Sequence, residues 1–294
     1  MYIKKLLTFF LFWLFCSSLA FANDCKLTEF KKYADNLDKT KIESVELLTN
    51  KYRELTINQS KKCTSKLFGE FWSYYYQFME SYEKKTLRNT APSENSLKKI
   101  KKEINKVGWK IYAEEGALWI DENGSWFIEN FGNSLPDDWK KFLQQRKKEK
   151  NEGFEVDAVM LIPWDELRLR IIYWEDFLKI YPSFQEKSTV ERYLSFYFPP
   201  YLTGMSDSRI YDFETKKVYE DVIKSYENFI KINKKSKYHK IVEDHYNILK
   251  KNSFVISYKT LEELVAFYKA NKFESSLSDE LRAYQPYKQW LYPE

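Results

Sequence analysis

The sequence predicts an all-α fold built from antiparallel helical hairpins, with a short β-hairpin within residues 117–128. Only 7 of the 294 residues are glycine and 8 are proline, and the frequent turns of an all-β chain depend on these two residues. Apolar residues recur at three- and four-residue spacing along most of the chain, which is the helical period. The order of residue types around Phe177 also occurs a second time in the chain, around Phe229. Such internal similarity indicates a structural repeat.

The first 22 residues predict a signal peptide. Lys4 and Lys5 precede an apolar run over residues 6–15, and residues 20–22 read Ala-Phe-Ala, with small side chains where a signal peptidase cleaves. The run is shorter than the ~20 apolar residues of a membrane-spanning helix. We therefore expect export to the periplasm or beyond the cell, in an envelope of the Gram-negative type, and no transmembrane segment in the mature chain.

A lipid-anchored form, attached through Cys16, is the alternative to simple export. It would need a small residue just before that cysteine, and the bulky Phe15 argues against it. We expect cleavage before Asn23 instead.

Cys25 and Cys63 are the two cysteines that remain after cleavage. Two cysteines in an exported chain predict a disulfide, with two free thiols as the alternative. Closing a loop of this length stabilises a fold by about 4 kcal/mol in the chain-entropy model. The bond would tie together an N-terminal helical unit, residues 23–90, and the remaining residues 91–294 would form a helical-repeat-like domain.

The N-terminal unit contains three amphipathic segments, within residues 25–38, 40–55 and 67–82, and Arg88 to Ser96 is predicted to be a connector. Thr40 is the expected cap of the second helix, and Ser93 of the helix that follows the connector.

In the middle of the chain the apolar spacing predicts a helix over residues 97–111. The stretch from Gly116 to Gly132 is the least helical, and Asn123-Gly124 favours the tight turn of a hairpin. Residues 134–152 predict another helix, and residues 154–162 a link.

The segment from Pro163 to Phe184 predicts one complete helix. Pro163 fits a first-turn position, and Pro182 ends the helix because the residue before a proline avoids helical geometry. Arg168, Arg170 and Glu175 are expected largely off its apolar stripe, which is formed by Leu167, Ile171, Trp174, Phe177, Leu178 and Tyr181.

The C-terminal part predicts a helix over residues 189–198 that Pro199-Pro200 ends. A loop over residues 201–213 follows, and Thr215 is the expected cap of the next helix. The further predicted helices cover residues 219–233, 238–249, 261–268 and 277–284.

Residues 174–180 (Trp-Glu-Asp-Phe-Leu-Lys-Ile) and 226–232 (Tyr-Glu-Asn-Phe-Ile-Lys-Ile) carry a family resemblance. With their surroundings they resemble tetratricopeptide-type repeats of bacterial periplasmic proteins, such as outer-membrane assembly lipoproteins and cell-division coordinators. The matching residues are Tyr173, Phe177, Pro182 and Ser183 in the first copy, and Tyr226, Phe229 and Ser236 in the second.

The resemblance covers about the C-terminal third of the chain. The two copies are further apart than the usual ~34 residues, and the small Gly and Ala positions of the family are absent. The resemblance implies a solenoid-like, tetratricopeptide-like C-terminal half with a protein-binding surface and no catalysis. From it we expect a non-enzymatic scaffold or protein-interaction module of the cell envelope, with an unidentified protein partner and no cofactor.

The alternative function is a cell-wall-directed hydrolase or a glycan-binding protein. Trp119 and Trp126 are accompanied by the carboxylates of Glu114, Glu115, Asp121 and Glu122, and carboxylates beside aromatic rings suit sugars. No spacing places two of these carboxylates across a cleft.

A second candidate binding site is the loop after residue 200, which contains Asp207, Arg209 and Asp212. The alternative is that this loop is an ordinary connector without a binding role.

His239 and Glu243 share a helix face, but unperturbed surface histidines are common, and we expect no metal site. Removal of Lys4 and Lys5 with the signal peptide takes the formal charge from +5 to +3, and this charge is spread along the chain, which argues against nucleic-acid binding.

Overall fold

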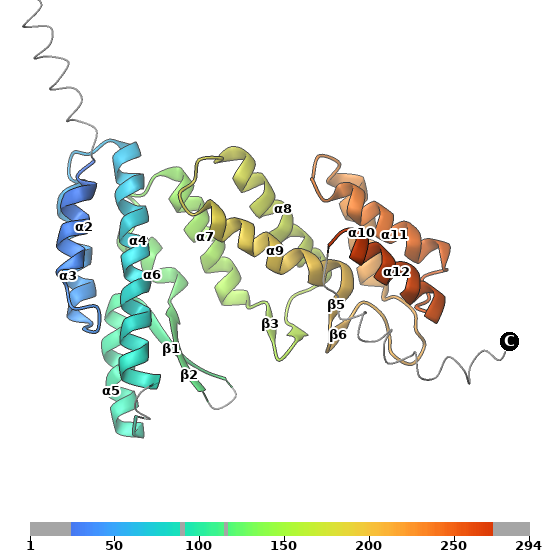
Figure 1. Ribbon diagram of the computed structural model, residues 1–294, viewed down its shortest axis with the longest axis horizontal. Coiled ribbons are helices and arrows are strands. Elements are labelled where there is room, and N and C mark those ends of the chain that lie inside the picture. The colour runs from blue at the N-terminus through green and yellow to red at the C-terminus, as the bar shows by residue number, and fades with distance from the viewer. Residues whose placement is uncertain (1–24, 89–91, 115–116, 273–294) are drawn as a thin grey trace, which may run out of the picture. The chain divides into compact units, whose positions relative to one another are not determined.

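The computed structural model describes residues 25–88, 92–114 and 117–272 (Figure 1). This part is mostly helical, as predicted, and it also contains short antiparallel strand pairs. The chain divides into two compact units, residues 1–148 and 149–294, so the expected boundary near residue 90 falls inside the first unit. The predicted signal peptide, Cys16, Glu115 and the helix over 277–284 lie outside the described residues.

The first unit is organised around its longest helix, α4. Its elements are α2 (Leu27–Asp35), α3 (Glu43–Thr56), α4 (Lys61–Glu83), a π-helical turn (Lys84–Arg88), α5 (Glu94–Ile104), a 3-10 turn (Asn105–Val107), β1 (Trp109–Glu114), β2 (Ala117–Glu122), α6 (Gly124–Phe131) and most of α7 (Asp137–Glu152). Helices α2 and α3 and strand β2 pack on α4. Because aromatic side chains recur at helical spacing along α4, they fill this core.

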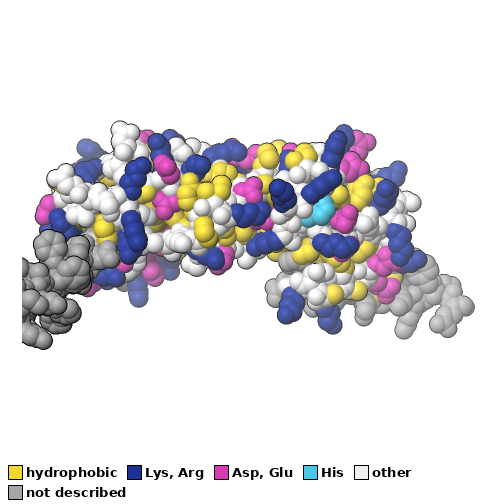
Figure 2. Space-filling model, turned by 90° about the horizontal axis from the view of Figure 1, so that it is seen from above, with side chains coloured by type: hydrophobic (Ala, Val, Ile, Leu, Met, Phe, Trp, Pro, Cys, Tyr) yellow, Lys and Arg dark blue, Asp and Glu magenta, His cyan; other side chains and the backbone are white. Residues whose placement is uncertain are grey.

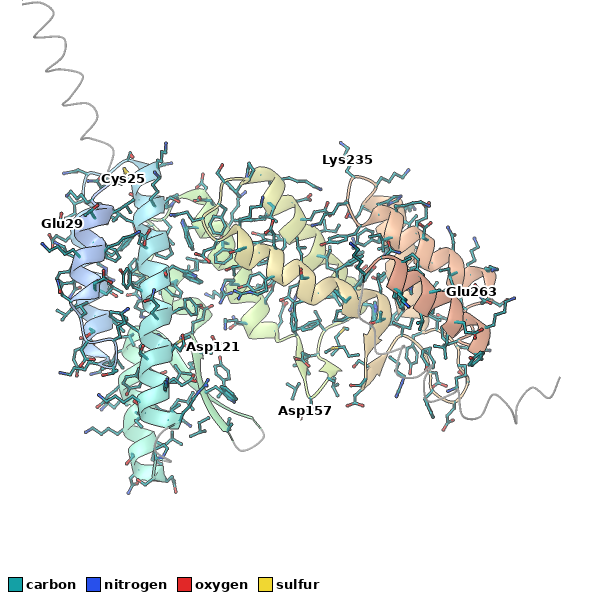
Figure 3. All side chains as sticks on the ribbon, viewed as in Figure 1. Cys25, Glu29, Asp121, Asp157, Lys235 and Glu263 are labelled. Atoms are coloured by element: carbon teal, nitrogen blue, oxygen red, sulfur yellow. A yellow bond between two sulfur atoms is a disulfide. The ribbon has the colours of Figure 1, made fainter. Side chains whose placement is uncertain are left out.

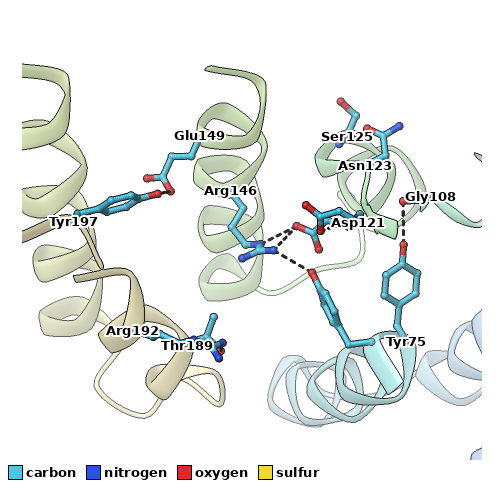
Figure 4. A network of polar contacts seen from close by, with 12 residues as sticks. Tyr75, Gly108, Asp121, Asn123, Ser125, Arg146, Glu149, Thr189, Arg192 and Tyr197 are labelled. Atoms are coloured by element: carbon cyan, nitrogen blue, oxygen red, sulfur yellow. Dashed lines mark hydrogen bonds and ion pairs between the residues drawn. The ribbon is translucent and has the colours of Figure 1, made fainter. Parts of the chain in front are cut away.

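Polar contacts connect α4 to the segments that surround it (Figure 4). The Tyr75 hydroxyl donates to the carbonyl oxygens of Val107 and Gly108, at 3.0 and 3.1 Å. The Arg146 guanidinium on α7 donates to the buried Glu122 carboxylate on β2 and, at 3.0 Å, to the Tyr76 hydroxyl. A buried ion pair with these additional hydrogen bonds holds α7 to the strand and to α4.

The predicted disulfide is present, and it joins Cys25 to Cys63 in the first turn of α4. Ser60 caps that helix by accepting a hydrogen bond from the Cys63 N–H, and Ser93 caps α5 as predicted. Thr40 does not cap α3, because its side chain bonds Asp38 instead.

The predicted position of the β-hairpin was wrong. Strands β1 and β2 pair with Trp109 opposite Glu122, and Asn123 is the N-cap of α6, where its side chain accepts from the Ser125 N–H at 3.2 Å. The predicted helix over 97–111 ends at Ile104. Gly108 explains the change of direction, since its φ of +80° favours glycine and a Cβ there would collide with the Trp126 ring.

The second unit contains helical hairpins. After β3 (Glu155–Val156) and β4 (Val159–Met160), α8 (Trp164–Ile180) pairs with α9 (Lys187–Thr203), and β5 (Gly204–Met205) and β6 (Ser208–Arg209) form a short turn. Helix α10 (Glu220–Ile232) pairs with α11 (His239–Lys251) and also packs on α8, and α12 (Tyr258–Ala270) packs on α11. Several helices that follow one another in the chain therefore pack together in this unit.

Helix α9 continues through Pro199 and Pro200, so the predicted end at these prolines was wrong. Proline inside a helix costs about 3 kcal/mol, but the turn that follows is buried and hydrogen-bonded. The Tyr226 hydroxyl donates to the carbonyl oxygens of Tyr201 and Leu202, both at 3.0 Å. The Trp164 indole N–H donates to the Tyr201 carbonyl oxygen as well. These contacts stabilise the last turn of the helix. The helix then ends at Gly204, which has a φ of +72°.

Helix α8 differs from its predicted pattern because Arg168, Arg170 and Glu175 are buried rather than solvated. The helix packs against α9 on one side and α10 on another, so it has no single solvent face. Each buried charge has an ionic partner, as buried charges require. The end of α7 contributes a buried carboxylate, Glu149, which accepts from the Tyr197 hydroxyl at 3.0 Å (Figure 4).

His245, on α11, is fully buried among aromatic rings, whereas a surface histidine is exposed to water. Its Nδ1 lies 3.1 Å from the Tyr268 hydroxyl, and its ring stacks on the Tyr268 ring. Its Nε2 has no hydrogen-bond partner within the described part of the chain. Burial lowers the pKa of His245 to about 3, because a charged imidazolium would lose its hydration there.

This burial predicts that the protein loses stability in mild acid. The unfolded chain binds a proton at His245 below the ordinary pKa of 6.5, while the folded chain keeps the ring neutral down to about 3. The contribution is therefore complete above pH 6.5 and is lost as the pH falls toward 3. Between pH 7 and pH 5 we expect the free energy of unfolding to drop by about 2 kcal/mol, measured by urea denaturation.

The control for this measurement is the other histidine. In His245→Phe the drop between pH 7 and pH 5 should largely disappear, whatever the variant's absolute stability, whereas His239→Gln should keep it. A wild-type stability that stays flat across this interval would show that His245 is not held neutral.

Candidate functional site

A groove in the second unit lies between α8 and the turn that joins α10 to α11. Its volume is about 490 Å³, within the range of ligand sites. The lining residues are Ile172, Glu175, Asp176 and Lys179 from α8, and Ile232, Asn233, Lys234, Lys235 and Ser236 from the end of α10 and the turn. Both copies of the repeated sequence pattern therefore contribute to one groove.

Glu175 forms the base of this groove and holds the turn in place. Its buried carboxylate accepts hydrogen bonds from the Ser236 hydroxyl at 2.5 Å and the Lys237 backbone N–H at 2.7 Å. Lys179, one helical turn further along α8, pairs with it at 3.0 Å. The turn is thus fixed to α8 by a charged acceptor, whose hydrogen bonds are stronger than those of neutral groups.

Three lysines line the groove, together with the acidic residues Glu175 and Asp176. Lys234 and Lys235 are exposed on the turn, where Lys235 is labelled in Figure 3. Lys179 is half-exposed and also pairs with Asp176 at 3.0 Å. Partial burial alone would lower the pKa of Lys179, but its hydrogen bonds to Asp176 and Glu175 outweigh this and raise it, so the ammonium stays charged.

Exposed aliphatic side chains accompany these charges. Ile180 and Ile232 end the two copies of the repeated pattern and are 61% and 63% exposed. Ile232 lines the groove, together with Ile172. Large apolar side chains left in solvent at the same position of both copies favour contact with another molecule.

A polar network sets the spacing between α8 and α10. Arg168 makes a two-pronged contact with Asp165, at 2.7 and 3.0 Å, and its other nitrogen donates to the Asn233 side-chain oxygen at 3.0 Å. The hydrogen bonds from Arg168 lower the pKa of Asp165. Asn228 on α10 also donates to Asp165, at 3.4 Å. Asn233 is thereby fixed where it lines the groove.

The structure places the three residues predicted in the loop after residue 200 in a short, structured segment. Asp207 is exposed in the β5–β6 turn, and Arg209 lies on β6 with its guanidinium 5.1 Å from the Phe213 ring centroid. Asp212 accepts from the Thr215 N–H and hydroxyl at 2.7 and 2.8 Å, and these bonds lower its pKa. Thr215 therefore stabilises this turn and does not cap α10.

The two tryptophans singled out in the sequence lie in different environments. Trp119 is exposed on β2, while Trp126 is buried on α6 and donates its indole N–H to the Lys106 carbonyl oxygen at 3.3 Å. Of the neighbouring carboxylates, Asp121 accepts from the Glu122 N–H and Glu122 pairs with Arg146. The structure does not bring Trp119 and Trp126 together on one surface.

Sequence reasoning missed the groove residues Glu175 and Ser236. The repeated pattern was visible, but Glu175 was expected off the apolar stripe and thus in solvent. Glu175 lies between Trp174 and Phe177 in the repeated pattern, and Glu227 occupies the same position in the second copy. This match indicated a repeat, but it did not indicate that Glu175 is buried. On the face drawn in Figure 2, basic and acidic side chains are interspersed, so charge alone does not mark the groove either.

Among the described residues, no cluster of three or more His, Cys, Asp and Glu side chains is placed to hold a metal ion. Nor does any helix in that part of the chain have both the length and the apolar character needed to cross a bilayer. Comparisons of the chain with protein-family models, with curated proteins and with solved structures found no match.

Proposed function

We propose that this is a non-enzymatic, exported helical interaction module, which binds a segment of a partner protein in the groove between α8 and the α10–α11 turn. The observation that supports it is the joint contribution of both sequence copies to one groove, whose lining includes three lysines and the exposed Ile232. In this proposal the hairpins α8–α9 and α10–α11 act as successive units of a tetratricopeptide-like array.

The chemistry of the groove indicates the kind of segment it takes. Lys234 and Lys235 offer positive charge at the rim, and Ile172 and Ile232 offer apolar contact beside it. A partner segment that combines acidic residues with a large apolar residue matches both features. The disulfide between Cys25 and Cys63 is compatible with a compartment outside the cytoplasm, where we place the protein.

A library of random peptides displayed on phage tests this proposal even though the partner is unidentified. Selection on the immobilised protein should enrich peptides with acidic and large apolar residues. In Lys234→Glu/Lys235→Glu, the affinity for these peptides should fall by about tenfold or more, because charge attraction becomes repulsion. Isothermal titration calorimetry with a synthetic copy of an enriched peptide measures the loss.

A second double variant serves as the matched control. Lys224→Glu/Lys269→Glu makes the same charge change at exposed positions of α10 and α12 that do not line the groove, and it should keep the affinity within about twofold. Enrichment of peptides without acidic residues, or an equal loss in both double variants, would contradict the proposal.

A further inference from the structure

The β1–β2 hairpin of the first unit presents two aromatic rings to solvent. Tyr112 and Trp119 are directly opposite each other in the strand pairing and are 45% and 42% exposed. Because side chains alternate between the two faces of a hairpin, Trp109, Ile120 and Glu122 lie on its other face, and all three are buried. The hairpin is thus anchored by one face and leaves an aromatic pair on the other.

An arginine is held against this pair from the end of α4. Arg88 follows the helix and lies with its guanidinium 4.9 Å from the Trp119 ring centroid. The buried carboxylate of Glu83 fixes it there, since one oxygen accepts from the Arg88 Nε at 2.8 Å and pairs with a terminal nitrogen at 2.6 Å. The other Glu83 oxygen accepts from the Ile120 N–H at 2.7 Å. One buried residue therefore positions both the arginine and the strand that carries Trp119.

This fixed geometry leaves part of the guanidinium available to a ligand. Glu83 occupies the Nε side, and the Arg88 side chain remains 55% exposed. The outer edge of a guanidinium carries further N–H groups in a planar fork that matches a carboxylate. Since Glu83 already restricts the side chain, binding at that edge costs little conformational entropy.

We propose that Tyr112, Trp119 and Arg88 form a binding platform for an acidic saccharide, a sugar that carries a carboxylate. The C–H faces of a pyranose ring carry small positive partial charges, which suit the negative faces of Tyr and Trp rings. The carboxylate of the same sugar takes the outer edge of Arg88. This platform lies in the first unit and does not depend on the peptide groove of the second unit.

The segment that leads from α5 into the hairpin is basic. Residues 94–110, which lead from α5 into β1, contain six lysines and two glutamates. Lys110 belongs to the same hairpin face as Tyr112, because the two residues are two positions apart on one strand. A local excess of positive charge raises the concentration of an acidic ligand near the platform.

The same neighbourhood argues against a lipid surface as the occupant. A helix that binds a bilayer needs an apolar face free to enter it, but the apolar side of α5 packs inward, with Ile104 buried and Leu97 and Ile100 half-buried.

Two disaccharides that differ by a single acidic group test the proposal. N-acetylglucosaminyl-N-acetylmuramic acid carries a lactyl carboxylate that N,N′-diacetylchitobiose lacks. Titrated into the full-length mature protein and followed by calorimetry or ligand-observed NMR, the acidic sugar should bind about tenfold more tightly than the neutral one. In Arg88→Gln this preference should vanish, while Trp119→Ala should weaken both sugars by about tenfold.

Controls separate a platform from a folding defect and from simple charge attraction. Tyr219→Ala removes an equally exposed aromatic side chain from the second unit and should leave both affinities unchanged, and the thermal unfolding of each variant shows whether it is folded. Binding of neither sugar, an Arg88→Gln variant that keeps the preference, or equal binding to phosphatidylglycerol vesicles through Trp119 would overturn the proposal. None of these results bears on the peptide groove, whose variants lie in the other unit.

Discussion

Replacement of Arg170 by alanine is expected to destabilise the second unit by about 3–5 kcal/mol. Arg170 is fully buried on α8, where a terminal nitrogen bonds the Glu152 carboxylate and the Gly153 carbonyl oxygen, both at 2.9 Å. Its guanidinium also lies 5.8 Å from the Tyr197 ring centroid. Removal of the side chain would take one hydrogen bond from the Gly153 carbonyl oxygen and one ionic contact from Glu152, and it would open a cavity; each of these effects is unfavourable.

Urea unfolding measures this loss, and hydrogen exchange locates it, because the amides of α8 and α9 should lose protection while those of α4 keep theirs. Arg192→Ala provides the control: the residue is an exposed arginine on α9, and its loss should cost no more than about 0.5 kcal/mol. If the two alanine variants proved equally stable, the contacts of the buried Arg170 would have no structural role.

Replacement of both disulfide cysteines, in Cys25→Ser/Cys63→Ser, should destabilise the first unit by about 4 kcal/mol. The bond closes a loop of 38 positions and joins the start of α2 to the first turn of α4. Without it the unfolded chain gains the freedom that the crosslink removes, so the equilibrium shifts toward unfolding. The midpoint of urea denaturation and the exchange rates of the α2 amides report the change.

Chemical reduction provides the matching experiment for the disulfide. A reductant should lower the stability of the wild-type protein to that of the double serine variant, and it should leave the variant unaffected. A wild-type midpoint that does not respond to complete reduction, verified by thiol alkylation and mass spectrometry, would show that helix packing on α4 alone stabilises the unit.

Much of the helical architecture could be predicted because it depends on local signals. Helices α4, α8, α10 and α11 have regular apolar spacing, and α5 begins at the predicted cap, Ser93. The β1–β2 hairpin could not be placed correctly from such signals. Residues 105–111 fit a helix as well as a strand by spacing, and the choice depends on the φ of +80° at Gly108 and on the pairing of β1 with β2.

The candidate sites were predicted only in part for a related reason. Trp119 was identified, but Arg88, which lies over its ring, was not. Glu83, which holds both Arg88 and the strand of Trp119, lies 37 positions before Ile120, whose N–H it accepts. Asp212 was selected as an exposed loop carboxylate, yet its oxygen is used by its own turn. Composition indicates which side chains suit binding, while their availability depends on the neighbours that the fold supplies.

By itself the sequence determined the helical class and the presence of two similar helix ends, and it predicted the Cys25–Cys63 disulfide that the structure contains. These properties follow from short-range periodicity, from the number of available cysteines and from repetition. Only the tertiary structure decided that Glu175 and Arg170 are buried, that Pro199 and Pro200 lie within a helix, and that Arg88 lies over Trp119. In each of these cases contacts between distant segments outweigh the local preference, because burial and charge pairing are worth more free energy than the propensity of one residue.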